Sequence, residues 1–266
     1  MARFKLLIEY AGTRYSGWQI QNNARTVQGE IERAVREVTG ERAFELYGSG
    51  RTDAGVHALG QVAHLDVRTS LPPGTLVGRI NDLLPADIHV LGASKVAHRF
   101  HARHDAVSRT YVYQVARRRT AFAKPFVWWV KDDLRVGAMR EAARAFTGRQ
   151  DFRGFTDDDP DDKSTLVEVA TVEVIEDADA LLLVVNGSHF LWKMVRRMTG
   201  VLVEVGRGGL EPDDVKRLLV SPSGLPAQLT APASGLFLAR VVYPGDPPST
   251  LPLPPGPRGN GVRPPV

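Results

Sequence analysis

The sequence predicts an α+β fold made of two similar ferredoxin/RNP-like β-α-β-β-α-β units with antiparallel sheets. Two observations support this prediction. β-prone runs and helical stripes alternate in that order over the first hundred residues, and nearly the same order begins again at Arg109. The chain has 266 residues, of which 43% are apolar, so it can bury a substantial core.

The first unit is expected over residues 1–105. Its strands are predicted at residues 4–10, 44–47, 62–67 and 88–96. The first helix is expected to begin after the N-cap Thr26 and to end at Gly40, and the second to run from Pro72-Pro73 to about Leu84.

The second unit is expected over residues 106–244. Strands are predicted at residues 111–115, 127–130, 167–175, 181–186 and 236–243, with a hairpin across 177–179. Apolar residues at helical spacing predict helices around Met139–Phe146 and from Phe190 to Val205. Two such units packed together would leave a cleft between them. Residues 245–266 are rich in Pro and Gly and are expected to form a flexible tail.

The composition excludes several classes of site. The chain has no cysteine, which excludes disulfides, thiolate zinc sites and a cysteine nucleophile. Its 34 basic and 30 acidic residues give a net charge of +4, and the basic residues cluster, as polyanion-binding surfaces and ordinary solvated faces both do. Glu9 interrupts the first apolar run, and no stretch approaches the roughly 18 apolar residues that span a bilayer. We therefore expect a cytoplasmic protein without a membrane segment.

The stretch GSGRTDAGVHALGQVAH, residues 48–64, places a single carboxylate, Asp53, in a glycine-rich loop. A dinucleotide-binding G-x-G-x-x-G motif is not favoured, because Asp53 occupies the third glycine position and would repel a pyrophosphate. A simple hairpin turn is the alternative, since Gly48, Gly50 and Gly55 all tolerate positive φ. Charged residues in such a loop instead favour a functional role.

This stretch resembles the central motif of the tRNA pseudouridine synthase A family, in which the segment GRTDAGVHA carries the catalytic aspartate. Further segments resemble the family in the same order. They are EYAGTRYSGWQIQ (9–21), TVQGEIE (26–32), NDLLPADIHV (81–90), FHARHDAVSRTYVYQV (100–115), FLWKMVRRMTGVLVEVGRG (190–208) and TAPASGLFLARVVYP (230–244). The resemblance therefore covers nearly all of residues 4–244.

The resemblance implies isomerisation of uridine to pseudouridine at nucleotides 38, 39 and 40 in the anticodon stem-loop of tRNA, by a homodimer without cofactor or metal. It implies that Asp53 is the nucleophile, that Arg196 is its ion-pair partner and that Tyr111 stacks on the target base. Arg51 matches the residue associated with base extrusion, although a phosphate contact or a loop-stabilising bond is an equal alternative. Whether the carboxylate attacks the sugar or adds to the base stays open.

Basic residues elsewhere are expected to contact the RNA backbone. They are Arg14, Arg25, Arg103 and Arg109. From the residues alone, Lys193, Arg196 and Arg197 form a polar helix face that either lines a cleft or is solvated. Tyr111 and Tyr113 share one strand face, as core tyrosines often do.

Two patterns, one rich in histidine and one acidic, are not interpreted as metal sites. His98, His101 and His104 are spaced as metal ligands could be, but residues 100–103 lie within a segment that matches the family, which implies no metal there. The run 157–162 lacks the glycine and terminal glutamate of a calcium loop and is expected to be an exposed acidic loop. The chain departs from the family where Leu166 and Val167 follow Thr165, a place at which an arginine is usual.

Overall fold

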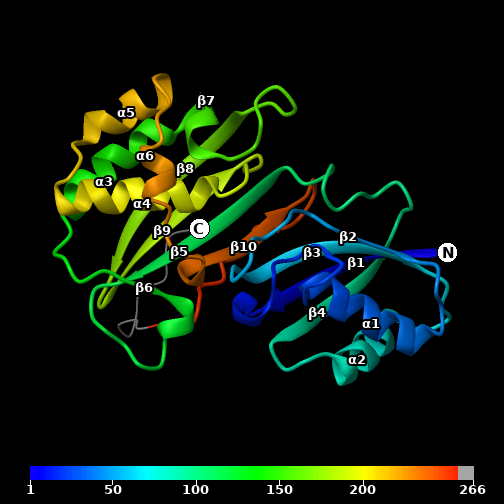
Figure 1. Cartoon of the computed structure of the whole chain (residues 1–266). Coiled ribbons are helices and arrows are strands. Elements are labelled where there is room, and N and C mark those ends of the chain that lie inside the picture. The colour runs from blue at the N-terminus through cyan, green and yellow to red at the C-terminus, as the bar shows by residue number, and fades with distance from the viewer. Residues whose placement is uncertain (257–266) are drawn as a thin grey trace. The chain divides into compact units, whose positions relative to one another are not determined.

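A computed structural model describes residues 1–256, which form two compact α+β units with mostly antiparallel sheets (Figure 1). The first unit comprises Met1–Val107 and Leu238–Pro248, and the second comprises Ser108–Phe237 and, of the described residues, 249–256. The predicted α+β class is confirmed. The last strand, which the sequence analysis placed in the second unit, is grouped mainly with the first.

The first unit contains its elements in the predicted order. They are β1 (Ala2–Tyr10), α1 (Val27–Thr39), β2 (Glu45–Gly48), β3 (His57–Val67), α2 (Pro73–Leu83) and β4 (Ile88–Val96). Strand β1 lies between β4 and β3, antiparallel to both, and β3 also pairs with β2 and with β10 (Leu236–Val242). Helices α1 and α2 lie side by side against this sheet (Figure 1).

Helix α1 has the ends that the sequence predicts. The Thr26 Oγ1 accepts a hydrogen bond from the backbone N–H of Gly29 at 3.3 Å, which satisfies one of the free donors of the first turn. Gly40 ends the helix at φ +72°, a left-handed conformation that glycine adopts without strain. The apolar residues Val27, Ile31 and Val35 are buried, so the helical stripe faces the core.

Strand β3 begins at His57, earlier than the predicted residue 62, because Ala58 and Gln61 already pair with β1, and at Gly60 another strand comes close. A Cβ at Gly60 would lie 2.6 Å from the carbonyl oxygen of Ala239 in β10. Glycine inside a strand can mark a point where another backbone comes close. The sequence analysis had assigned this glycine to the loop.

The second unit has a four-stranded antiparallel sheet in the order β5-β9-β8-β7. Its elements are β5 (Ser108–Ala116), β6 (Trp128–Trp129), α3 (Val136–Ala143), β7 (Gly148–Asp151), β8 (Leu166–Asp177), β9 (Ala180–Gly187), α4 (Met194–Arg207), α5 (Pro212–Val220) and α6 (Leu225–Gln228). The predicted β8–β9 hairpin is confirmed, and the short β6 runs parallel to β5. Strand β7 and helices α5 and α6 were not predicted.

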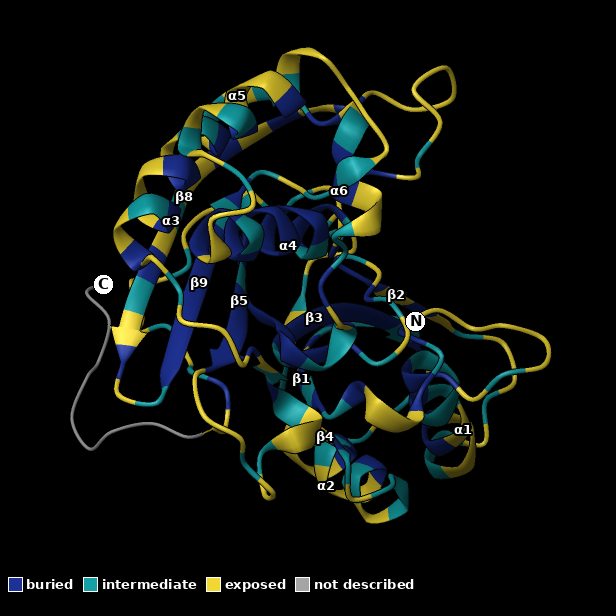
Figure 2. Cartoon of the chain, turned by 60° about the vertical axis from the view of Figure 1, so that its left-hand side comes forward, coloured by how far each residue is buried: buried dark blue, intermediate teal, exposed yellow. Residues whose placement is uncertain are grey.

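Helix α4 is buried on nearly all sides, as its dark colour in Figure 2 shows. It begins at Met194 rather than at Phe190, because Lys193 has a φ of +61° and cannot continue a right-handed helix. Gly200 allows another segment to pass close by, since a Cβ there would lie 1.7 Å from the carbonyl oxygen of Leu229. The helix is therefore a core element of the second unit.

The described part of the predicted tail, residues 245–256, makes specific contacts. Lys5 Nζ donates to Asp246 Oδ1 at 3.1 Å, and Gln114 Nε2 donates to the carbonyl oxygen of Pro255 at 3.0 Å. Residues 257–266 of the predicted tail lie outside the described residues. Within residues 1–256, none of the helices has the length and apolar character needed to cross a membrane.

Candidate active site

Asp53 lies in the loop 49–56, which joins β2 to β3, and its side chain is half-buried. The backbone N–H of Val56 donates to the Asp53 carbonyl oxygen at 3.1 Å, which closes a turn around the aspartate. Gly55 occupies this turn at φ +78°, a conformation that favours glycine. Asp53 thus stands at the first position of a tight turn.

Gln61 fixes the start of this loop. Ser49 Oγ donates to Gln61 Oε1 at 2.7 Å, and Gln61 Nε2 donates to the Gly50 carbonyl oxygen at 3.0 Å. The Ser49 N–H also donates to the Val62 carbonyl oxygen at 2.7 Å. Because both polar ends of the buried Gln61 side chain are used, the chain before Arg51 has a defined path.

The segment Tyr15–Trp18 holds the other side of the loop. The N–H of Trp18 donates to the Thr52 carbonyl oxygen at 3.1 Å, and the N–H of Gly55 donates to the Tyr15 carbonyl oxygen at 3.2 Å. Gly17, at φ +90°, makes this approach possible, since a Cβ there would lie 2.5 Å from the Thr52 oxygen. Two backbone hydrogen bonds therefore hold the loop on either side of Asp53.

The side chain of Thr52 anchors the loop to the core. Its Oγ1 lies 2.8 Å from the hydroxyl of Tyr10, which is buried in β1. Burial raises the pKa of the Tyr10 hydroxyl well above its usual range, so this group stays neutral and hydrogen-bonded. The residue next to Asp53 is thereby tied to the central strand of the sheet.

A hollow of about 80 Å³ lies beside this loop, and Arg51 and Arg103 both contribute to its wall. Trp18, Tyr47 and the glycines at positions 48 and 50 form further parts of the wall. Among the described residues that line the hollow, none carries a carboxylate. The structure therefore brings Arg51, two residues before Asp53 in the chain, and Arg103 to one hollow.

Tyr111 and Arg196 lie in the second unit. Tyr111, half-buried on β5, meets the ring of Phe190 edge to face, with ring centroids 5.3 Å apart. Arg196 Nε donates to the carbonyl oxygen of Ala231 at 2.8 Å, and the Ala231 N–H donates to the Arg196 carbonyl oxygen at 3.1 Å. Tyr113 is fully buried and its hydroxyl donates to Pro232, so this tyrosine has a core role. The predicted ion pair between Asp53 and Arg196 stays a prediction.

The expected polar face of α4 is wrong for Arg197, which is buried. Its guanidinium forms an ion pair with Asp157, which also accepts a hydrogen bond from Lys193 Nζ at 2.8 Å. The hydrogen bonds from Lys193 and Arg197 lower the pKa of the Asp157 carboxyl. The run 157–162 is largely exposed, as predicted, and Asp157 at its start pairs with the two basic residues Lys193 and Arg197.

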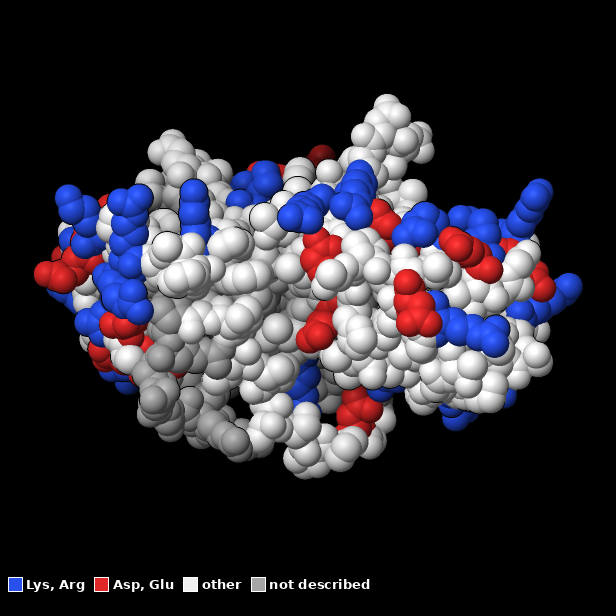
Figure 3. All heavy atoms as spheres, turned by 90° about the horizontal axis from the view of Figure 1, so that it is seen from below, with Lys and Arg blue, Asp and Glu red and all other residues white. Residues whose placement is uncertain are grey.

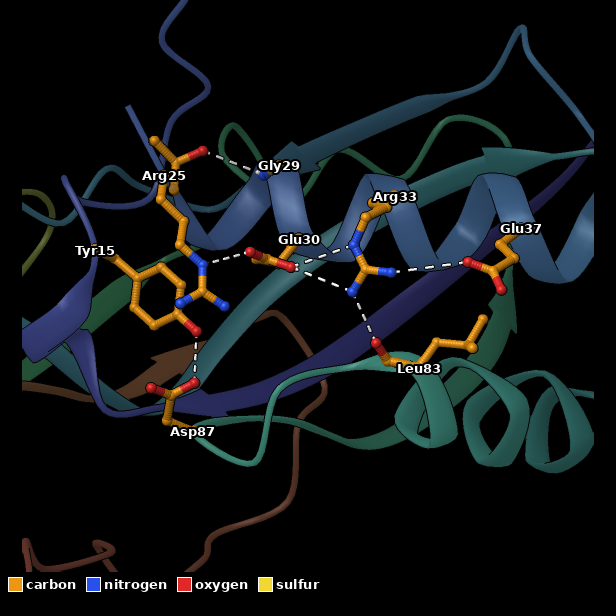
Figure 4. A network of polar contacts seen from close by, with 9 residues as sticks. Tyr15, Arg25, Gly29, Glu30, Arg33, Glu37, Leu83 and Asp87 are labelled. Carbon is orange, nitrogen blue, oxygen red and sulfur yellow. Dashed lines mark hydrogen bonds and ion pairs between the residues drawn. The ribbon is translucent and has the colours of Figure 1, made fainter. Parts of the chain in front are cut away.

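The other predicted arginines differ in their surroundings. Arg14 is exposed on the 3₁₀ turn Gly12–Arg14. Arg25 lies over the ring of Tyr15 and donates to Glu30 Oε1 at 2.5 Å, within a chain of ion pairs along α1 (Figure 4). Arg109 is buried, and its Nη1 donates to the Ser188 carbonyl oxygen at 2.7 Å. Arg14 and Arg25 thus remain accessible to a polyanion, whereas Arg109 supports the fold around Ser188.

The surface charge is mixed. Figure 3 shows Lys and Arg side chains interspersed with Asp and Glu over the face that it presents. The net charge of +4 is accordingly not spread as a continuous basic surface there. On that face, an RNA contact would depend on particular arginines rather than on an overall field.

The histidines of the segment 98–104 do not group as metal ligands. His101 and His104 pack ring against ring with centroids 4.2 Å apart, and His101 Nδ1 accepts hydrogen bonds from the backbone. Within residues 1–256, no three His, Asp or Glu side chains are arranged to hold a metal ion. The sequence analysis gave the buried His64 no role, although its contacts lead to the same segment.

Comparison with known proteins agrees with the resemblance. A sequence model described as "tRNA pseudouridine synthase" matches residues 6–105 and 142–244. The tRNA pseudouridine synthase A of Rhodopseudomonas palustris is 43% identical over 91% of this chain and 100% of its own length, and that of Geobacter sulfurreducens is 42% identical over the same shares. The tRNA pseudouridine synthase A 2 of Clostridium tetani is 37% identical over 91% of this chain and 100% of its own length. This chain therefore belongs to the tRNA pseudouridine synthase family.

Proposed function

We propose that this chain isomerises uridines 38, 39 and 40 in the anticodon stem-loop of tRNA, with Asp53 as the nucleophile. Membership of the family supports the coarser reaction, uridine to pseudouridine in tRNA. The observation that carries the assignment to Asp53 is its loop. Bonds from the segment 15–18, from Tyr10 and from Gln61 hold the backbone on both sides of one half-buried carboxylate. Catalysis benefits from such fixed geometry because a misplaced group loses much of its effect.

The reaction balances without a co-reactant. The N1–C1′ bond of the uridine breaks, the uracil turns, and C5 forms the new bond to C1′ while the C5 hydrogen leaves as a proton and N1 gains one. A carboxylate at position 53 can attack C1′ or add to the base, and either route passes through a covalent adduct that is later released. Both routes need an ionised carboxylate, which the proposed ion pair with the positively charged Arg196 would favour.

The remaining residues are assigned to binding. Tyr111 is proposed to stack on the target base, and Arg51 to take part in extruding it from the stem, a step that costs a few kcal/mol of stacking and pairing. Arg51 and Arg103 share one hollow without a carboxylate, which suits contact with the RNA backbone. Arg14 and Arg25 are proposed as outer contacts. The homodimer and the cytoplasmic location stay predictions.

The test is the release of tritium from tRNA labelled at C5 of its uridines. We expect the protein to release tritium from an unmodified transcript with uridines at 38–40, with or without a chelator. Asp53→Asn and Asp53→Ala should abolish release while tRNA binding largely survives. An RNA-binding module would give no release from the wild type, and a metal-dependent hydrolase would lose its activity with the chelator. Transcripts with cytidine at all but one of the three positions identify which nucleotides are used.

A further inference from the structure

Arg103 reaches the hollow from a loop with no regular secondary structure, residues 98–105, called here the Arg103 loop. The loop follows β4, and the Arg103 side chain is exposed. A loop of this kind presents a side chain in one place only if its backbone groups are held by other parts of the fold. The hydrogen-bond partners of this backbone therefore decide where Arg103 stands.

The carbonyl groups of the Arg103 loop are held by a donor from β1 and by Tyr243, the residue that follows β10. Arg3 Nη1, on β1, donates to the carbonyl oxygens of His98 at 2.5 Å and Phe100 at 2.7 Å. The same guanidinium is fixed by Asp66, with Nε 2.7 Å from Oδ1. The hydroxyl of Tyr243 donates to the Ala102 carbonyl oxygen at 2.6 Å.

The amide groups of the loop are accepted by two histidine rings. His64 Nδ1, on β3, accepts from the N–H of Ala102 at 3.2 Å. His101 Nδ1 accepts from the N–H of Arg103 at 3.1 Å and of His104 at 3.3 Å. A ring nitrogen accepts a hydrogen bond only when it carries no proton, so both rings act here in their neutral form with the hydrogen on Nε2.

Tyr47 links these two rings to the hollow. Its ring stacks on His64 with centroids 5.8 Å apart and meets His101 with centroids 5.0 Å apart. The rings of His64 and His101 are themselves 4.8 Å apart. Because Tyr47 and Arg103 both line the hollow, the two histidines lie directly behind its wall.

The surroundings favour the neutral rings. Burial, the positive charge of Arg3 and the neighbouring His101 lower the pKa of His64, and Glu45 and Asp66 only partly oppose this. The pKa of His101 is likewise lowered, first by burial and then by His104 and Arg3, against the opposite effect of Asp105 and Glu45. Both rings are therefore acceptors at neutral pH.

We propose that His64 and His101 are positioning residues for substrate RNA. As Nδ1 acceptors they hold the Arg103 loop so that Arg103 stands beside Arg51 and binds a phosphodiester of the tRNA strand. This inference rests on the proposed function, because it needs RNA at the hollow. Neither histidine touches the reacting atoms.

The test compares two replacements at each histidine. His64→Asn and His101→Asn keep an oxygen acceptor where Nδ1 stands, and at position 101 the asparagine forms an Asx turn with the N–H two residues on. His64→Leu and His101→Leu remove the acceptor. His89→Leu, at an exposed position on β4, controls for the loss of a histidine, and Arg42→Ala controls for the loss of an exposed arginine. Dissociation constants for the tRNA transcript are measured at several salt concentrations at pH 7.5, and thermal unfolding identifies folded variants.

We expect Arg103→Ala to weaken binding about tenfold and to reduce the salt slope by about 1, as the loss of one phosphate contact does. His64→Leu and His101→Leu should weaken binding about three- to tenfold with the same change in slope. The two asparagine variants and both controls should stay within about twofold of wild type. In an Arg103→Ala background the leucine variants should cause no further loss.

Position 101 is half-buried and keeps the test usable if His64→Leu, at a fully buried site, does not fold. Leucine and asparagine variants that bind equally well, or leucine variants that weaken Arg103→Ala further by their full effect, would overturn the positioning role. Tritium release by the wild type is measured in parallel. If it occurs, either of these results refutes the inference alone; if it does not, the proposed function itself fails.

Discussion

Replacing Gly17 by alanine should damage catalysis although Gly17 carries no side chain. At φ +90°, an alanine Cβ would lie 2.5 Å from the Thr52 carbonyl oxygen and 3.2 Å from the Asp53 carbonyl carbon. All of these contacts are to backbone atoms, so no flexible side chain can give way. The collision must push the loop 49–56, and Asp53 with it, away from the segment 15–18.

Gly40→Ala supplies a matched control for the backbone strain. Gly40 has a φ of +72°, similar to that of Gly17, but nothing lies within 4 Å of a Cβ there. Left-handed backbone costs an alanine about 1–2 kcal/mol of unfolding free energy, which is the whole expected effect at position 40. Overpacking adds about 1–3 kcal/mol at position 17, for a total of about 2–5 kcal/mol.

The assay is tritium release under single-turnover conditions, alongside unfolding by urea. A shift of about 1 Å in a reacting group costs up to about a hundredfold in rate. We therefore expect Gly17→Ala to lose about 10- to 100-fold in rate at temperatures where it is folded, and Gly40→Ala to keep its full rate. Equal rates for the two folded variants would refute the argument that this contact places Asp53.

Three further predictions follow from contacts described above. Asp157→Ala should lower the unfolding free energy in urea titrations by about 2–3 kcal/mol, because it leaves the buried Arg197 without its ion-pair partner. The loss is smaller than for a fully buried ion pair because solvent screens the exposed Asp157. A loss no larger than that of Asp159→Ala would contradict this. Because the pKa values of His64 and His101 are lowered in the folded protein, the unfolded chain binds more protons than the folded one below about pH 6.5. The unfolding free energy should therefore be complete above that pH and fall with acidification, less steeply in His64→Asn. Equal pH slopes for the wild type and His64→Asn would argue against it. Tyr111→Phe should keep near-normal tritium release because the ring that meets Phe190 remains, whereas Tyr111→Ala should lose it; equal losses would assign the role to the hydroxyl.

Local signals in the sequence were enough to predict most of the first unit. Thr26 and Gly40 mark the ends of α1 because an N-cap and a left-handed C-cap act within one turn of helix. Helix α5 has similar signals: Pro212 is at its first position, and the preceding Glu211 donates its backbone N–H to Asp214 Oδ2 at 2.7 Å, as in a capping box. The sequence around residues 211–214 therefore contains the information that predicts α5.

The rest depended on contacts between residues far apart in the chain. The sequence alone predicts a loop at Gly60, and only the structure shows that Ala239 lies against this glycine. The sequence likewise favours a solvated Arg197, whereas the structure pairs it with Asp157. In the site, the resemblance drew attention to Asp53, but nothing local indicates that Gly17 and Tyr10 hold its loop. Likewise, nothing in the sequence near His64 indicates that it accepts a hydrogen bond from the N–H of Ala102, 38 positions away.

The first unit is discontinuous, and this has a consequence for synthesis of the protein. Strand β10 pairs with β3, the Val107 N–H donates to the Val242 carbonyl oxygen, and Tyr243 binds the Ala102 carbonyl oxygen. When the ribosome has made residues 1–235, strand β10 is therefore still missing, and β3 has no partner on that side of the N-terminal sheet. Nascent chains of that length should remain protease-sensitive in their first hundred residues, and tRNA capture should arise only when the final strand has left the exit tunnel.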